Sequence, residues 1–257
     1  MRNILAPIKF VLFIPLISLI VLLLNTKQVV AAAVSWTGVS GNWETAGSWS
    51  SGSLPTANDD VTINSNVTVS ITGSQASYII NSLTLGNGTT TPTLNFGFDA
   101  VSTNKPLTID DGNFTAYANT IITHTVATTS GIVGRINILV STGNFTLNGT
   151  INVNNKGYPG GDSGHRNGYG TGGGIGYYVQ YVTGSAGGAG HGGAGGAGSH
   201  AAGGVRYQDL NAPTDLGSGG GMGYAYGGTS GAGGIGGGQV KIIVSSGTMS
   251  ISNTISA

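Results

Sequence analysis

The sequence predicts an all-β protein built as a right-handed parallel β-helix, with a glycine-rich insertion between two of its coils. Three observations predict this fold. Short apolar stretches with a two-residue alternation follow one another from residue 60 to 122. One strand-and-turn unit occurs twice, at 134–151 and 238–255. Between these copies, residues 155–237 are about two-fifths glycine.

The composition excludes several classes of protein. Charged residues make up 7% of the 257 residues, against about 25% in an ordinary globular domain. Three of the nine Lys and Arg precede residue 34, whereas all nine Asp and Glu follow it, so residues 34–257 carry a net charge of −3. A nucleic-acid partner is excluded, because it requires a concentrated basic face. With no cysteine, the fold must be held by repetition and packing alone.

The N-terminus has the layout of a secretory signal peptide, which we assign to residues 1–33. Arg2 and Lys9 precede the apolar run 10–24, and Ala31-x-Ala33 fits a cleavage site that would leave Val34 as the mature start. Cleavage after Ala31 fits nearly as well. An uncleaved membrane anchor is the alternative, but fifteen apolar residues fall short of the ~20 that span a bilayer. We therefore expect a secreted, extracellular or cell-surface protein.

The mature chain divides into four segments. Residues 34–60 form a tryptophan-rich N-terminal cap, and residues 61–154 form coils of the β-helix. The glycine-rich insertion occupies 155–237, and residues 238–257 form one more coil. We expect the three tryptophans of the cap to cover the open edge of the first coil. A sugar-stacking platform is the alternative for them.

The two copies of the repeat predict which residues face the core. They align without a gap at an offset of 104 residues, with seven of eighteen positions identical. Such a unit cannot bury its apolar face alone, but it can when it stacks on a copy. Alternation predicts that one set of residues points inward and stacks on its copy: Ile136, Ile138 and Val140 on Val240, Ile242 and Val244. A β-sandwich is the structural alternative.

A second apolar stripe lies on the opposite parity of the same strands. Leu139 and Ile243 occupy the same position of the two copies, and Ile79 and Ile122 look similar. Solvated strands would carry polar residues there. We therefore expect the insertion, or a partner chain, to cover this stripe.

The glycines of the insertion recur at every third position, for example at 184, 187, 190, 193 and 196. The same spacing occurs at 161, 164, 170, 173 and 176, with Asn167 as the one exception, and again at 228, 231, 234 and 237. Collagen has this period but also needs abundant proline, which these runs lack. The period favours polyproline-II-type segments packed side by side, with glycine at the crowded contacts. A flexible linker, the alternative, has no reason to keep a period.

Tyrosine is concentrated in the insertion. Tyrosine among glycine, serine and asparagine is typical of binding loops, because its ring offers a large amphipathic contact at low entropic cost. Loops on a rigid scaffold commonly carry function. The alternative is that the rings only cover polyglycine backbone. The candidate binding residues are Tyr158, Tyr169, Tyr177, Tyr178, Tyr181, Tyr207, Tyr224 and Tyr226.

The start of the mature chain resembles a known group of proteins. Residues 36–49 read WTGVSGNWETAGSW, followed by Leu54-Pro55 and by NDDVTI at 58–63. This pattern resembles the opening of exported bacterial β-helix proteins of the autotransporter-passenger and large-adhesin type. The resemblance implies a β-helix, export, and a structural or adhesive role with extracellular or cell-surface glycans or proteins as partners. The family's C-terminal β-barrel or sorting signal is absent from the sequence, and the chain stops in mid-unit at Ala257, so we expect a truncated chain.

Candidate catalytic and metal-binding groups are few. The pairs Asp59-Asp60 and Asp110-Asp111 could supply oxygen ligands to Ca²⁺, with Arg135 as a basic partner, but turn chemistry explains them better. The four histidines lack the spacing of a zinc site. We therefore assign no catalytic residue, no metal and no cofactor, and favour a protein that is not an enzyme.

Two further functions stay open at this stage. One is a secreted carbohydrate-active β-helix enzyme that degrades polysaccharides. The other is an ice- or crystal-binding surface, because regular threonine arrays can order water. Regular Thr-x-Thr repeats would support an ice- or crystal-binding surface, but the sequence shows only the threonine-rich stretch 89–93 and scattered pairs of threonines.

Overall fold

The computed structural model describes residues 30–97, 105–129, 134–207 and 214–257. The chain divides into two compact units, Met1–Ala31 and Ala32–Ala257. Most of the predicted signal peptide lies outside the described residues. In the described ranges the structure is all-β apart from one short 3-10 turn, η1 (Ala46–Ser48). None of the helical structure in these ranges is long and apolar enough to cross a membrane.

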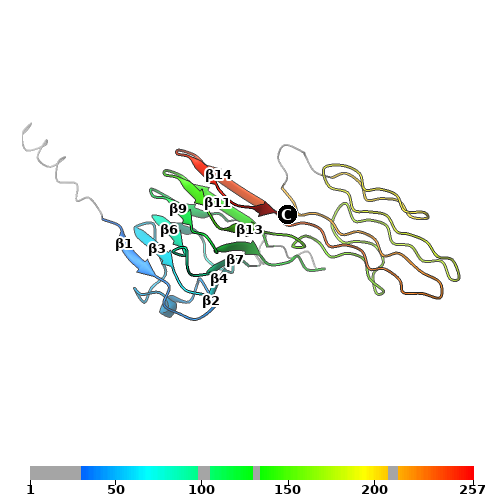
Figure 1. Ribbon diagram of the computed structural model, residues 1–257, viewed down its shortest axis with the longest axis horizontal. Coiled ribbons are helices and arrows are strands. Elements are labelled where there is room, and N and C mark those ends of the chain that lie inside the picture. The colour runs from blue at the N-terminus through cyan, green and yellow to red at the C-terminus, as the bar shows by residue number, and fades with distance from the viewer. Residues whose placement is uncertain (1–29, 98–104, 130–133, 208–213) are drawn as a thin grey trace, which may run out of the picture. The chain divides into compact units, whose positions relative to one another are not determined.

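The strands form three sheets in which all paired strands run parallel, and successive strands of the chain pass from sheet to sheet (Figure 1). Sheet one has the order β1 (Ala32–Ser35), β3 (Asp59–Ile63), β6 (Ser82–Leu85), β9 (Phe114–Ala116), β12 (Phe145–Leu147) and β15 (Met249–Ile251). Sheet two has the order β16 (Ile255–Ser256), β13 (Thr150–Asn152), β10 (Ile121–His124), β7 (Thr93–Phe96), β4 (Thr68–Ile71) and β2 (Gly41–Asn42). Sheet three has the order β14 (Val240–Val244), β11 (Ile136–Val140), β8 (Leu107–Ile109) and β5 (Tyr78–Ile80). The β-sandwich alternative is wrong, because such sandwiches are built from antiparallel strands.

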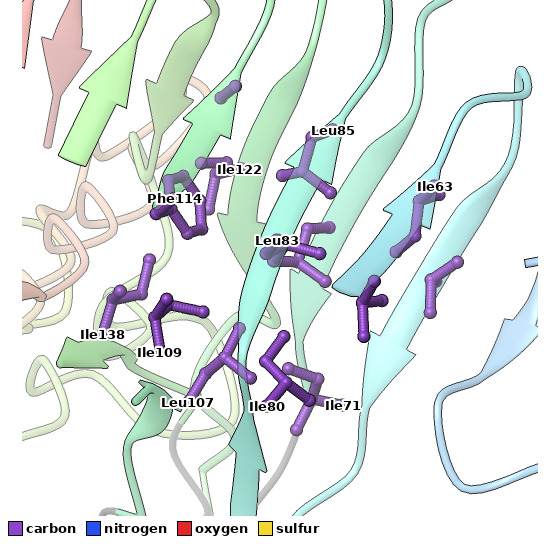
Figure 2. Close-up of a cluster of buried hydrophobic side chains, with 14 of the residues drawn as sticks. Ile63, Ile71, Ile80, Leu83, Leu85, Leu107, Ile109, Phe114, Ile122 and Ile138 are labelled. Carbon is purple, nitrogen blue, oxygen red and sulfur yellow. The ribbon is translucent and has the colours of Figure 1, made fainter. Parts of the chain in front are cut away.

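The core lies between the three sheets. Alternate residues of each strand point inward, and Figure 2 shows Leu83 of β6, Ile122 of β10 and Ile109 of β8 within one cluster of buried side chains. All three are fully buried. Each such side chain contributes roughly 1.5–3 kcal/mol on burial, so repetition supplies the stability that disulfides would otherwise provide.

The three tryptophans pack together near the start of the stacked sheets. Trp49 meets the rings of Trp36 and Trp43 edge to face, at centroid distances of 4.9 and 4.7 Å. Its Nε1 donates a hydrogen bond to the carbonyl oxygen of Trp43 at 2.8 Å. All three side chains are buried, so none offers an exposed face on which a sugar ring could stack.

The predicted stacking across the insertion is confirmed. Strands β11 and β14 pair in parallel with Ile138 opposite Ile242. The pairs that flank it are also those predicted, Ile136 with Val240 and Val140 with Val244. The β11 residues are fully buried, whereas their partners are only partly buried because β14 is the edge strand of its sheet.

The prediction of a covered outer stripe is only partly right. Ile79, Thr108, Leu139 and Ile243 do lie in register on the outer face of sheet three. Leu139 is half-buried, but Ile79 and Ile243 are 38% and 42% exposed, so the insertion does not cover them, and cover by a partner chain stays a prediction. Assigning Ile122 to this outer set was wrong. Ile122 is fully buried and its neighbour Ile121 faces outward. Because two isoleucines follow one another here, the sequence pattern does not decide which of them points inward.

Candidate binding site in the glycine-rich insertion

The insertion begins and ends beside the same coil. It leaves after β13 and returns just before β14, and the amide of Gly238 donates to the carbonyl oxygen of Val153 at 2.8 Å. The first and last segments then run side by side, since the Gly157 amide donates to the Gly236 carbonyl at 2.7 Å. The inserted residues are therefore attached to the β-structure at both ends.

Backbone hydrogen bonds order the insertion throughout its described length. The Gly161 amide donates to Gly220, the Gly220 amide to Gly234 and the Gly233 amide to Gly161, at 2.8–2.9 Å. Comparable bonds link neighbouring segments along the insertion, such as Gly174 to Gly219 and Gly221 to Gly187. Segments far apart in sequence thus satisfy one another's backbone groups. The insertion is ordered packing, and the flexible-linker alternative is wrong.

Glycine is required where segments approach closely. A Cβ on Gly168 would lie 1.8 Å from the carbonyl oxygen of Gly219, and one on Gly187 would lie 1.8 Å from that of Ala202. The period of three locates these contacts only in part. Gly187 and Gly190 are crowded as predicted, but a Cβ at Gly193, Gly196, Gly231 or Gly234 would meet nothing within 4 Å.

Four tight turns lie where the extended segments reverse direction away from the β-strands (Figure 1). Their closing hydrogen bonds join Asp162 to His165, Val182 to Val179, Gly198 to Ala201 and Gly228 to Ala225. We call these the far turns. In the first of them, Asp162 accepts hydrogen bonds from the amides of Gly164 and His165, and these bonds lower the pKa of its carboxyl.

Two of the far turns bring four tyrosines together. Tyr178 and Tyr224 meet edge to face at a centroid distance of 4.6 Å, and Tyr181 and Tyr226 do so at 5.1 Å. The guanidinium of Arg166 lies 4.1 Å from the centre of the Tyr178 ring, a cation–π contact. Tyr181 is 65% exposed, Tyr226 56% and Tyr178 47%. We call Tyr178, Tyr181, Tyr224 and Tyr226 the tyrosine cluster.

The backbone fixes the geometry of this cluster. Gly184 and Tyr224 exchange two hydrogen bonds at 2.9 and 3.0 Å, and the Tyr226 amide donates to the hydroxyl of Thr183. Tyr181 has a φ of +70°, a left-handed conformation that costs a non-glycine residue roughly 1–2 kcal/mol. Such strain often occurs at functional positions. Here it places the most exposed tyrosine at the tip of its turn.

Three other candidate tyrosines cover glycine backbone instead. A Cβ on Gly170, Gly172 or Gly184 would lie within 2.6 Å of a tyrosine ring atom in each case. The rings concerned are those of Tyr158, Tyr207 and Tyr177 respectively. Tyr177 is buried and stacks on His200, and Tyr169 stacks on His165. For Tyr158, Tyr177 and Tyr207, packing explains the side chain without a ligand.

A charged contact anchors the base of the insertion. Arg135, which directly precedes β11, forms a salt bridge of 3.1 Å with Asp215 of the insertion. The hydroxyl of Tyr158 donates to the same carboxylate at 3.3 Å, and that of Tyr207 donates to the carbonyl of Leu216. Burial raises the pKa of both phenols, and Asp215 adds to the effect. Arg135 thus contacts the insertion and not the aspartate pairs with which the sequence allowed it to act.

The aspartate pairs take part in turns and strand contacts. The Asp59 carboxylate accepts from the amide and hydroxyl of Thr56 at 2.7 and 2.8 Å. The Asp60 carboxylate accepts from Asn81 and Ser82, and Asp111 accepts from Thr142. These contacts fit the turn chemistry favoured from the sequence. Over the ranges that the structure describes, no three His, Asp or Glu side chains gather as a metal site would require.

One polar residue in the core escaped the sequence reasoning. His124 is fully buried at the end of β10, where its Nδ1 lies 2.8 Å from the Thr125 carbonyl oxygen. Its Nε2 accepts from the Gln239 amide at 3.1 Å, at the point where the chain returns from the insertion. Burial lowers the pKa of His124 to about 4. The neutral ring therefore links the end of β10 to the residue that precedes β14, 115 positions later in the sequence.

Comparison with known proteins gives no family model, no curated protein and no solved structure that matches this chain. Function must therefore be inferred from the site itself. The tyrosine cluster is the place where exposed aromatic surface, a cation and a fixed backbone coincide.

Proposed function

We propose that this chain is an exported adhesive protein that recognises its ligand through the tyrosine cluster. Its scaffold is a right-handed parallel β-helix, and its insertion is a set of polyproline-II-type segments packed side by side. The ligand is a glycan or a protein on a cell surface or in the extracellular matrix. The observation that carries the proposal is the pairing of Tyr178 with Tyr224 and of Tyr181 with Tyr226 at the far turns.

The fold supports this scaffold. In a three-sided β-helix, successive strands of the chain enter three parallel sheets in turn, and the strand orders of this chain fit that pattern. Crossovers between parallel strands are right-handed in nearly all known proteins. Polyproline-II-type packing requires backbone hydrogen bonds between neighbouring segments and glycine at their contacts. The insertion has both. Such a layer holds its turns at fixed positions.

The surface chemistry supports recognition. Tyrosine rings present a large contact area with only two side-chain torsions to restrict, so ordering them costs little entropy. The neighbouring Val179 and Val182 are also exposed, which extends the apolar surface. Arg166 adds a positive charge beside the ring of Tyr178. Sugar rings can stack on such aromatic faces while the phenol hydroxyls and the guanidinium donate hydrogen bonds.

The proposed export rests on the signal-peptide pattern of residues 1–33, and the pairing of β1 favours one of the two proposed cleavage sites. The amide of Ala32 donates to the Asn58 carbonyl at 2.8 Å, and Ala32 and Ala33 pair with Asp59 and Asp60. Cleavage after Ala33 would remove half of β1. We therefore place cleavage after Ala31, which leaves β1 whole.

Substitution of the two most exposed tyrosines tests the binding proposal. The variant carrying Tyr181→Ala and Tyr226→Ala should lose about tenfold or more in affinity for a glycan array or for cells, as exposed aromatic anchors do in other interfaces. Tyr117→Ala is the matched control, since Tyr117 is also exposed but lies in the turn after β9. Equal binding by the double variant and the parent, or an equal loss in the control, would refute the proposal. So would a parent chain that binds neither cells nor any glycan.

A further inference from the structure

The outer face of sheet one carries a row of hydroxyl groups that no single segment of the sequence reveals. Each of its six strands contributes one serine or threonine, and strand pairing places them in one register. The row, which we call the hydroxyl ladder, consists of Ser35, Thr62, Thr84, Thr115, Thr146 and Ser250. Parallel strands set its spacing at about 4.8 Å.

The hydroxyls of the ladder are not used within the protein. In the described part of the chain, none of the six side chains forms a hydrogen bond, and all six residues are half-buried or exposed. The polar residues beside them behave differently. Asp60 accepts from Ser82, and the side-chain oxygen of Asn144 accepts from the amide and hydroxyl of Thr248. The neighbouring polar groups therefore stabilise the coils, whereas the ladder offers its hydroxyls to solvent.

The ladder stands on a rigid support. Beneath its middle strands, the adjacent residues Leu83, Phe114 and Phe145 are fully buried, and the last two rings stack at 4.7 Å. Threonine is β-branched and has few side-chain rotamers. A periodic ligand would thus meet hydroxyl and methyl groups whose positions are already fixed, which lowers the entropic cost of binding.

We propose that the hydroxyl ladder binds an ordered water lattice, that is, the surface of ice. The ladder contains no charged residue and no aromatic ring. Charges would favour a soluble ion, and sugar-binding faces commonly use aromatic rings. Uncharged hydroxyl and methyl groups at a fixed repeat instead match a solid whose own hydrogen-bonding groups repeat. This site is separate from the tyrosine cluster and does not depend on it.

Partition of the full chain between growing ice and liquid water tests the proposal. The parent should be enriched in ice, and Thr115→Lys in the middle of the ladder should reduce that enrichment about tenfold, because a long charged side chain keeps the face away from the lattice. Thr84→Lys, one coil away, should act in the same way. Thr93→Lys is the matched control, since Thr93 is a half-buried outward residue of sheet two with no side-chain hydrogen bond.

Circular dichroism and thermal unfolding must show that each variant keeps the fold of the parent. A parent excluded from ice as fully as serum albumin would overturn the proposal, as would an equal loss with Thr93→Lys. Binding to microcrystalline cellulose or chitin that Thr115→Lys abolishes, without enrichment of the parent in ice, would assign the ladder to a polysaccharide instead. Loss of ice binding in the Tyr181→Ala and Tyr226→Ala variant would show that the two sites are not separate.

Discussion

Two neighbouring glycines of the insertion should respond in opposite ways to the same substitution. A Cβ on Gly233 would lie 1.9 Å from the carbonyl oxygen of Gly220, whereas one on Gly234 would meet nothing within 4 Å. Neither residue has a positive φ. Gly233→Ala should therefore disrupt the packing of the insertion, and Gly234→Ala should leave it intact.

The size of the effect follows from the hydrogen bonds at this contact. Real Cβ atoms do not approach other atoms within 3.0 Å, so the two segments must separate by about 1 Å. Three backbone hydrogen bonds of 2.8–2.9 Å join Gly161, Gly220, Gly233 and Gly234, and a shift of that size would break them. At about 1 kcal/mol each, Gly233→Ala should destabilise the insertion by roughly 3 kcal/mol. Gly234→Ala should be neutral or should stabilise it by about 0.4–1 kcal/mol, because alanine restricts the unfolded chain.

Native-state hydrogen exchange measures both effects at the residues concerned. In Gly233→Ala, the amides of Gly161 and Gly220 should exchange roughly two orders of magnitude faster than in the parent, as a loss of about 3 kcal/mol requires. In Gly234→Ala they should exchange at the parental rate. Equal rates in both variants would show that close backbone contacts do not hold the insertion together.

Three further predictions concern the scaffold and its leader. Burial holds the pKa of His124 at about 4, below its ordinary value of 6.5. The free energy of unfolding should therefore be highest above pH 6.5 and fall by roughly 3 kcal/mol as the pH drops to 4. Urea titrations of His124→Gln should lack this pH-dependent loss of stability. Ile138→Asp places an unpaired charge at a fully buried position and should cost about 3 kcal/mol or more, whereas Leu139→Asp on the outer face of the same strand should cost far less by the same measurement. N-terminal sequencing of the exported protein should begin at Ala32, and a start at Val34 would contradict the requirement for an intact β1.

Much of the scaffold could be predicted from the sequence because it repeats. The gapless alignment of the two copies predicted the pairing of Ile138 with Ile242, because a shift in register by one residue would turn every inward apolar side chain outward. The same reasoning failed where the pattern was ambiguous. Ile121 and Ile122 are both apolar, and the inward position that follows them is the polar His124.

The candidate sites could be predicted only in part. Composition located the tyrosines, but the two pairs join turns about 45 residues apart in sequence. Hydrogen bonds such as those between Gly184 and Tyr224 hold these turns together, and the sequence does not reveal them. The hydroxyl ladder was hidden for a related reason. Thr62, Thr84 and Thr115 are unequally spaced in sequence because the connections between coils differ in length. Strand register, which the sequence does not state, aligns them.

Cysteine cross-linking across the insertion tests the central claim most directly, namely that the coils on either side of it stack in one register. The chain has no native cysteine, and Leu139 and Ile243 are directly paired on the outer face. Parallel neighbours lie about 4.8 Å apart, within the range of about 4.4–6.8 Å between Cα atoms that a disulfide allows. The variant with Leu139→Cys and Ile243→Cys should form an intramolecular disulfide on mild oxidation, while Leu139→Cys with Lys241→Cys, two residues out of register, should not. Absence of the first cross-link, or equal formation of both, would contradict the account.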